Sequence, residues 1–126
     1  ILLDAPCSGS GTLRRHPDIK LLRDARSLPE YASGQRKLLD NLWPLLKTGG
    51  TFVYCTCSLF EEENDAVLAA FLAEHSDADL VPITLPLGRA TRFGWQLLPL
   101  PAGDRLPNQT VDGFYFARMT RREKAR

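Results

Sequence analysis

The sequence predicts an α/β fold in which a mostly parallel sheet carries helices on both faces and ends in an antiparallel last strand. Short segments rich in β-branched and aromatic residues alternate with longer segments of three-and-four apolar spacing, and glycine or proline separates them. Of the 126 residues, 44% are hydrophobic and 25% are charged, which is typical of one compact globular unit.

The first expected strand is Ile1 to Asp4, an apolar run that ends in a carboxylate. The loop from Ala5 to Gly11 follows it, because its proline and glycines cannot continue regular structure. A short helix is expected from Asp18 to Asp24. Because the chain opens abruptly on a core strand, we expect it to be a C-terminal fragment.

The segment that follows Ser27 is predicted to be a long helix. Ser27 and Glu30 have the spacing of a capping box at its start, and Gly49-Gly50 ends it. Pro44 should tighten the last turn because it lacks an amide donor. The apolar positions of this helix are Tyr31, Leu38, Leu39, Leu42, Trp43, Leu45 and Leu46.

Thr51 to Thr56 is typical of a strand buried on both sides, with Cys57-Ser58 at its C-terminal edge. Ser58 and Glu61 have the spacing of a second capping box, which predicts a helix from about Glu61 to His75. Glu63 and Asn64 are expected either to brace the Cys57 loop or simply to cap this helix.

The remaining strands are expected at Leu80 to Thr84, more weakly at Trp95 to Leu98, and at Phe114 to Met119. Pro99 to Pro107 is expected to be a loop, and Asp112-Gly113 a turn. The domain is predicted to cover residues 1–119, with a basic tail at 120–126. Pro82 to Asn108 matches no known motif.

Ligands of parallel α/β sheets bind beyond the carboxyl ends of the strands. Asp4 and Cys7 follow one strand end, and Cys57 follows another. The topology therefore predicts that a carboxylate and two thiols converge on the same rim. Cys57 also precedes a helix N-terminus, whose partial positive charge favours a thiolate. Cys55 should be a small core residue.

Alternative roles for the thiols are a buried loop thiol for Cys7, a zinc site, and a redox pair of Cys55 with Cys57. Zinc is disfavoured because His16 and His75, better suited to a loop and a helix end, do not complete a ligand pattern. A bridge between neighbours on one strand is strained, which disfavours the redox pair.

The net charge of +1 does not by itself predict a nucleic-acid partner. Basic residues nevertheless cluster after the first loop and at the C-terminus, where they are either phosphate contacts or solvated surface. No apolar run approaches the roughly 20 residues that cross a bilayer, so we expect a cytoplasmic location and no membrane partner. The basic residues concerned are Arg14, Arg15, Lys20, Arg118, Arg121, Arg122, Lys124 and Arg126.

Three motifs resemble the Sun/Fmu family of RNA cytosine-5 methyltransferases, and within it the bacterial enzymes of small-subunit ribosomal RNA. They are Asp4-Ala5-Pro6-Cys7-Ser8-Gly9-Ser10-Gly11, Thr56-Cys57-Ser58 with Glu63-Asn64 after it, and Asp112-Gly113-Phe114-Tyr115-Phe116-Ala117.

The resemblance implies the C-terminal half of a Rossmann-like, S-adenosylmethionine-dependent methyltransferase fold. It further implies that Cys57 attacks cytosine C6, that Cys7 assists product release, and that Asp4 lies by the methyl donor. A target base must be unpaired or flipped out, and Arg14 and Arg15 are the candidates for holding its RNA backbone.

Two other functions compete with RNA methylation. Pro6-Cys7 matches the pair with which DNA cytosine-5 methyltransferases attack, and a non-catalytic RNA-binding module could keep the same fold. Thr56-Cys57-Ser58 favours RNA, and retention of Asp4 with both thiols argues against a decayed site. No glycine-rich donor loop is present, so we expect this chain alone neither to bind the donor tightly nor to turn over.

Overall fold

The computed structural model describes residues 1–12, 27–99 and 112–124. The expected helix from Asp18 to Asp24 lies outside the described residues, as do Arg14, Arg15, His16 and most of the expected loop from Pro99 to Pro107.

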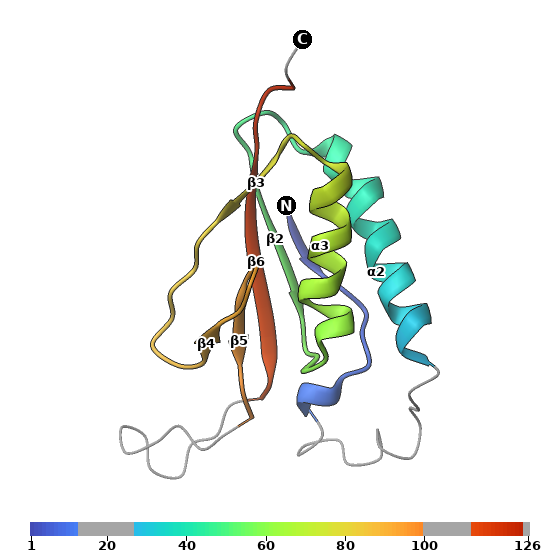
Figure 1. The fold of residues 1–126 in the computed structure, drawn as a ribbon, viewed down its shortest axis with the longest axis vertical. Coiled ribbons are helices and arrows are strands. Elements are labelled where there is room, and N and C mark those ends of the chain that lie inside the picture. The colour runs from blue at the N-terminus through green and yellow to red at the C-terminus, as the bar shows by residue number, and fades with distance from the viewer. Residues whose placement is uncertain (13–26, 100–111, 125–126) are drawn as a thin grey trace.

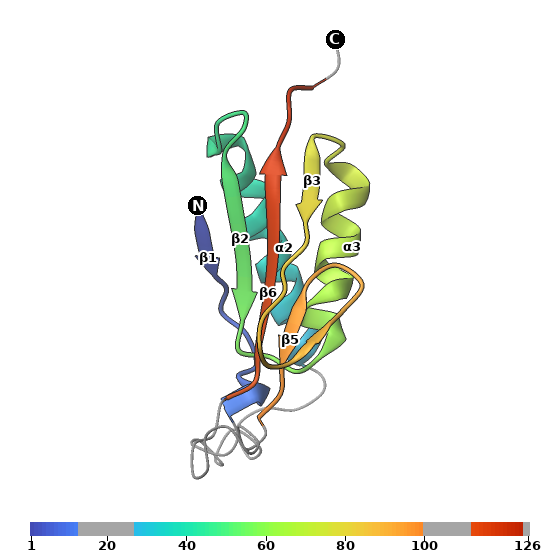
Figure 2. The same ribbon diagram turned by 90° about the vertical axis from the view of Figure 1, so that its left-hand side faces the viewer.

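Six strands form one sheet in which β6 holds the central place. On one side β6 pairs antiparallel with β2, which pairs parallel with β1, and on the other side it pairs antiparallel with β3 and β5. β1, β2, β3 and β5 therefore run in one direction and β6 runs against them (Figure 2). The predicted parallel strands and antiparallel last strand are confirmed. The strands are β1 (Leu2–Asp4), β2 (Thr51–Thr56), β3 (Ala78–Val81), β4 (Arg89–Ala90), β5 (Trp95–Leu97) and β6 (Phe114–Arg121).

Two helices, α2 (Leu28–Leu42) and α3 (Asp65–Glu74), cover the same face of this sheet (Figure 1). The crossovers β1–α2–β2 and β2–α3–β3 advance in the same direction across the sheet. Right-handed crossovers that advance in one direction place their helices on one face. Helices on the other face, which the sequence also led us to expect, do not occur among the described residues.

The core lies between the sheet and these helices. Alternate residues of β2 and β6 point toward the helices and are fully buried, as the two-residue period of a strand requires. Trp43 packs edge-on against Phe71 with ring centroids 5.3 Å apart. The largest of the buried core side chains are Leu39, Trp43, Phe52, Tyr54, Leu68, Phe71, Tyr115 and Met119.

The start of α2 differs in detail from the prediction. Ser27 is the N-cap residue, but its side chain makes no capping hydrogen bond. Its backbone is helical rather than extended, and Pro29 in the first turn has no amide hydrogen to offer. At the other end Pro44 does tighten the chain, into the 3-10 turn η3 (Trp43–Leu45).

The prediction of a second capping box, from Ser58 to Glu61, is wrong. α3 begins at Asp65, after a separate 3-10 turn, η4 (Glu61–Glu63). The Ser58 hydroxyl, instead of capping a helix, accepts a hydrogen bond from the Phe60 amide and donates to the Glu63 carboxylate.

Of the later strands, β5 and β6 begin at the predicted residues, Trp95 and Phe114, whereas β3 lies earlier than the predicted Leu80 to Thr84. β3 ends at Val81 because Pro82 cannot donate to a sheet ladder. β6 continues to Arg121, so Thr120 and Arg121 of the expected tail belong to the sheet. The Arg121 guanidinium is tied to Asp77, 3.1 Å away, so this member of the basic cluster serves the fold. Neither helix in the described part is long and apolar enough to cross a membrane.

Candidate active site

The loops after β1 and β2 meet at the rim where these strands end, at the lower edge of Figure 2. There the Sγ atoms of Cys7 and Cys57 lie 3.2 Å apart. The predicted convergence of the two thiols is confirmed. Asp4 closes β1 directly beside them, paired in register with Cys55, and its side chain is exposed.

Backbone hydrogen bonds join the two loops along their length. The Ala5 amide donates to the Cys55 carbonyl, and the Gly11 amide donates to the Cys57 carbonyl at 2.8 Å. The Gly113 amide, just before β6, donates to the Gly11 carbonyl. A Cβ on Gly11 would lie 2.3 Å from the Gly113 oxygen, so only glycine allows the three segments to approach.

Close packing, rather than a turn, requires a glycine at position 113. We expected it to serve a turn, but its backbone does not adopt the left-handed conformation. A Cβ there would instead lie 2.4 Å from Leu59 and 2.8 Å from Gly11. The requirement is close packing of β6 against the Cys57 loop.

A buried carboxylate, Glu63, clamps the two loops together. It accepts hydrogen bonds from the Ser8 amide at 2.7 Å and the Ser8 hydroxyl at 2.6 Å. It also accepts from the Ser58 hydroxyl and, at 3.2 Å, from Gln35 of α2. Ser8 follows Cys7 and Ser58 follows Cys57, so this one side chain holds a neighbour of each thiol.

Asn64 completes the support of the Cys57 loop. Its amide oxygen accepts from the Thr56 hydroxyl at 2.6 Å, and its amide nitrogen donates to the Ser58 carbonyl at 2.9 Å. These bonds fix the residues on both sides of Cys57. Of the two roles considered for Glu63 and Asn64, bracing of the loop is confirmed, and Asn64 makes no side-chain capping bond to α3.

The contact shifts the pKa values of the two thiols in opposite directions. The hydrogen bond from Cys7 lowers the pKa of Cys57 to about 7, against the effects of burial and of the nearby Asp4 and Glu63 charges. The same bond, together with burial, raises the pKa of Cys7 well above the ordinary range. Near neutral pH, Cys57 therefore carries the thiolate, and Cys7 stays protonated as its hydrogen-bond donor.

The other cysteine and the described histidine lie apart from this chemistry. Cys55 is buried, and burial raises its pKa to about 11, which confirms the predicted core residue. His75 is at the end of α3, where Nε2 lies 2.9 Å from Asp40. Within residues 1–12, 27–99 and 112–124, no group of three His, Cys, Asp or Glu side chains is placed to hold a metal ion.

Solved structures share this arrangement of strands and helices. PH0851 superposes with a TM-score of 0.82 at 33% identity, over 95% of this chain and 26% of its own. A methyltransferase homolog protein from Pyrococcus horikoshii gives a TM-score of 0.70 at 28% identity, over 96% of this chain and 38% of its own. The chain thus has the Rossmann-like α/β fold of methyltransferases.

The chain belongs to the 16S rRNA methyltransferase RsmB/F family, whose profile matches residues 1–120. Among curated proteins, ribosomal RNA small subunit methyltransferase B of Yersinia enterocolitica is 46% identical over 122 residues. That match takes in 97% of this chain but 26% of the relative, so the chain spans about a quarter of the length of such proteins.

Proposed function

We propose that the protein carrying this chain methylates C5 of a cytosine in small-subunit ribosomal RNA, with S-adenosylmethionine as the methyl donor. The observation that carries the proposal is the 3.2 Å contact between the sulfur atoms of Cys57 and Cys7 at the rim. Membership of the RsmB/F family supports ribosomal RNA as the substrate.

The chemistry of cytosine explains why a thiolate is needed. C5 is a weak nucleophile, so the Cys57 sulfur first forms a bond to C6 and pushes the ring electrons toward C5. C5 then takes the methyl group from the positively charged sulfur of the donor, and the bond between that sulfur and the methyl carbon breaks with its electrons left on the sulfur. A base removes the C5 proton, the electrons of that C–H bond restore the C5–C6 double bond, and the C6–S bond breaks to return the thiolate.

Cys57 is the better nucleophile of the pair, and Cys7 is its hydrogen-bond donor. The pKa of Cys57, about 7, keeps much of it ionised at neutral pH, whereas Cys7 stays protonated. The hydrogen bond that Cys7 donates to the departing Cys57 sulfur stabilises the thiolate that leaves C6, which favours product release. This division of roles also disfavours DNA-type chemistry through Cys7.

One side chain of this rim, Asp4, is suited to contact the methyl donor. The exposed Asp4 carboxylate has no hydrogen-bond or ion-pair partner within the described part of the chain, and it lies beside the thiols. S-adenosylmethionine supplies a methyl group on a positively charged sulfur, and an unpaired carboxylate complements that charge. We assign Asp4 to orienting the donor, the target base or both.

The test is covalent trapping with RNA that contains 5-fluorocytosine, using the complete protein and S-adenosylmethionine. The fluorine on C5 cannot be removed as a proton, so the Cys57–C6 adduct persists and is seen as a shifted band on a denaturing gel. We expect the adduct in the parent protein and in Cys7→Ala, and none in Cys57→Ala. Cys55→Ala is the matched control and should trap normally.

The outcomes separate the competing functions. An adduct that survives Cys57→Ala and vanishes with Cys7→Ala would assign the attack to Cys7. Trapping of DNA in preference to RNA would identify the DNA reaction. RNA binding without any adduct would leave a non-catalytic module and overturn the proposal.

A further inference from the structure

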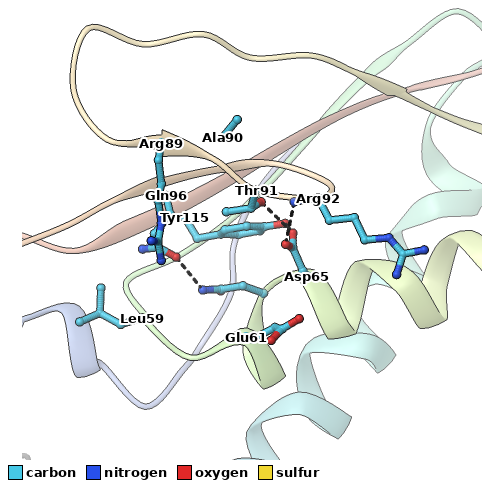
Figure 3. Close-up of a pocket in the computed structure, with 10 residues that line it drawn as sticks. Leu59, Glu61, Asp65, Arg89, Ala90, Thr91, Arg92, Gln96 and Tyr115 are labelled. Atoms are coloured by element: carbon cyan, nitrogen blue, oxygen red, sulfur yellow. Dashed lines mark hydrogen bonds between the residues drawn. The ribbon is translucent and has the colours of Figure 1, made fainter.

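A pocket of about 330 Å³ lies beside the Cys57 loop, between the start of α3 and the β4–β5 hairpin (Figure 3). Leu59, two residues after Cys57, lines one wall, and Arg89 and Arg92 of the hairpin flank the opposite side. We propose that this pocket binds the phosphodiester backbone of single-stranded RNA next to the target cytosine. The inference rests on the function proposed above.

The hairpin is fixed in place by one carboxylate of α3. Asp65 accepts hydrogen bonds from the Thr91 hydroxyl at 2.9 Å, the Arg92 amide at 3.0 Å and the Phe93 amide at 3.2 Å. It also accepts from the Tyr115 hydroxyl at 2.7 Å. Four donors occupy this charge, so the turn that carries Arg92 is tied to the same helix that follows the Cys57 loop.

Glycine allows the hairpin to lie close against β6. A Cβ on Gly94 would lie 2.2 Å from the Phe116 oxygen and 2.9 Å from the Tyr115 hydroxyl. Gly88, before β4, has a φ of +90°, which side chains rarely adopt. The hairpin is thus a built part of the rim, with its arginines at a defined place.

Two residues that line the pocket, Gln96 and Asn64, also contact the Cys57 loop. Gln96 of β5 is buried, and its amide nitrogen donates to the Ser58 carbonyl at 3.3 Å. Its amide oxygen accepts from Asn64, which in turn braces Ser58. A ligand in the pocket therefore lies one layer of side chains from the residues that position the thiolate.

No carboxylate in the described residues neutralises the guanidinium charge of Arg89 or Arg92. Arg89 and Arg92 are both exposed, and neither guanidinium has an ion-pair or hydrogen-bond partner in residues 1–12, 27–99 and 112–124. Arg92 lies over the Phe93 ring at 4.8 Å, which holds its side chain in a preferred direction. Figure 3 places the two arginines at opposite ends of the pocket.

These features select a phosphodiester among anionic ligands. Guanidinium groups match phosphate oxygens in geometry as well as in charge. Two of them at opposite ends of an open pocket can each hold a phosphate of an extended strand, whereas one small anion reaches only one. Glu61 lines the wall below and repels phosphates there, which keeps the backbone on the hairpin side.

The position relative to Cys57 identifies which nucleotides are held. Leu59 is two residues from Cys57, so at most roughly 7 Å of backbone separates them. That is about the reach of one nucleotide along a single strand. The pocket therefore holds phosphates that flank the target base, and a base thus anchored on one side can enter the rim unstacked.

The test measures RNA affinity of the complete protein as a function of salt, with a single-stranded RNA that contains one target cytosine. We expect Arg89→Gln/Arg92→Gln to weaken binding roughly ten- to a hundredfold. The slope of log affinity against log salt should fall in magnitude by roughly 1.4, because each lost phosphate contact accounts for about 0.7. Lys47→Gln, which changes an exposed cation at the other end of β2, is the matched control and should alter neither quantity.

A charge-retaining variant guards against misfolding as an explanation. Arg89→Lys/Arg92→Lys should keep the salt slope while losing part of the affinity. At saturating RNA, the glutamine variant should still form the 5-fluorocytosine adduct, because the thiols are untouched. Unchanged affinity and slope in the glutamine variant would overturn the RNA site even if the adduct forms. Loss of the adduct from the parent protein would instead overturn the proposed reaction.

Discussion

The thiols of Cys7 and Cys57 touch at 3.2 Å, although fifty residues separate them in the chain. Each thiol lies in a loop that leaves a different parallel strand, so the sheet brings them together. Because one proton is shared across this contact, each thiol sets the acidity of the other. The reactivity of Cys57 is therefore a property of the pair.

The first prediction concerns the pH dependence of Cys57. Replacing Cys7 with alanine removes the hydrogen bond that stabilises the thiolate, so the pKa of Cys57 should rise from about 7 toward the ordinary value of roughly 8.5. The thiolate forms as pH rises through the pKa. At pH 7 the alkylation rate of Cys57 should consequently fall about tenfold.

Alkylation by iodoacetamide between pH 5 and 10, followed on the Cys57 peptide by mass spectrometry, measures this shift. Cys55→Ala removes the third thiol, which is buried, without touching the contact, and its profile should overlay that of the parent protein. A Cys7→Ala profile with its midpoint still near 7 would show that Cys7 does not control the acidity of Cys57.

The second prediction concerns the carboxylate clamp. Glu63→Gln keeps the size of the side chain but brings an amide group against donors of Ser8 and Ser58. Losing one or two hydrogen bonds to a charged group costs about 1.5–3 kcal/mol, which corresponds to a roughly ten- to hundredfold slower adduct formation. The effect should fall on kcat rather than on KM, because the clamp positions sulfur atoms and not RNA.

Glu62→Gln is the control for this variant. Glu62 lies in the same 3-10 turn but is exposed, so its substitution should leave the rate of adduct formation unchanged. Single-turnover kinetics on 5-fluorocytosine RNA provide the measurement. Equal rates for the two glutamine variants would remove Glu63 from the positioning of the thiols.

A third prediction compares two glycines. Gly11→Ala should destabilise the protein by about 1–3 kcal/mol, because its Cβ would lie 2.3 Å from the Gly113 oxygen and 2.7 Å from the Cys57 oxygen. Gly34→Ala meets nothing within 4 Å on the surface of α2 and should stabilise it by about 0.5–1 kcal/mol. Urea unfolding monitored by tryptophan fluorescence distinguishes the two signs, and a stabilising Gly11→Ala would contradict the packing described for the rim.

The fourth prediction concerns the ion pair under β6. Although burial acts to raise the pKa of Asp77, hydrogen bonds from Trp43 and Arg121 bring it below its usual value. A carboxylate with a depressed pKa contributes stability above its unfolded pKa of roughly 3.9 and loses it as pH falls through the folded pKa. Asp77→Ala should therefore cost about 3 kcal/mol at pH 7 and much less near pH 2.

The exposed pair of Asp79 with Arg122 provides the comparison, because its 3.6 Å contact lies in solvent. Asp79→Ala should change the unfolding free energy by less than about 1 kcal/mol at either pH. Thermal unfolding at the two pH values tests both variants. A loss in Asp77→Ala that does not shrink in acid would show that packing, rather than charge, accounts for its cost.

Much of the fold follows from local patterns in the sequence. The β-branched run Thr51 to Thr56 gives both ends of β2, and the apolar spacing after Ser27 gives the existence and start of α2, because strand and helix periods are local properties. The end of α2 was predicted too late, at Gly49-Gly50, whereas the helix ends at Leu42. Helix starts are harder to predict. Ser27 and Ser58 have the right spacing for caps, but Ser58 donates to Glu63, which Ser8 and Gln35 hold from distant parts of the chain.

The site was predicted in part. The rule that parallel strands end at one rim brought Asp4, Cys7 and Cys57 together without any coordinates. It could not reveal that Glu63, the last of three successive glutamates, turns inward while Glu61 and Glu62 face solvent. The hydrogen bonds from the β4–β5 hairpin to Asp65 were also not predicted. Nothing in residues 82–99 indicates a hairpin that bonds to a helix so far away in the chain.

The central place of β6 determines when the rim can be completed during synthesis. β6 pairs with β2 and β3, and Gly113 just before it donates to Gly11 of the Cys7 loop, yet β6 follows all of them in the chain. A strand pairs only after it has left the ribosome, so the gap between β2 and β3 stays open until residues 114–121 emerge. The two thiols thus gain their final support late, which delays the assembly of a reactive sulfur until the sheet around it is closed.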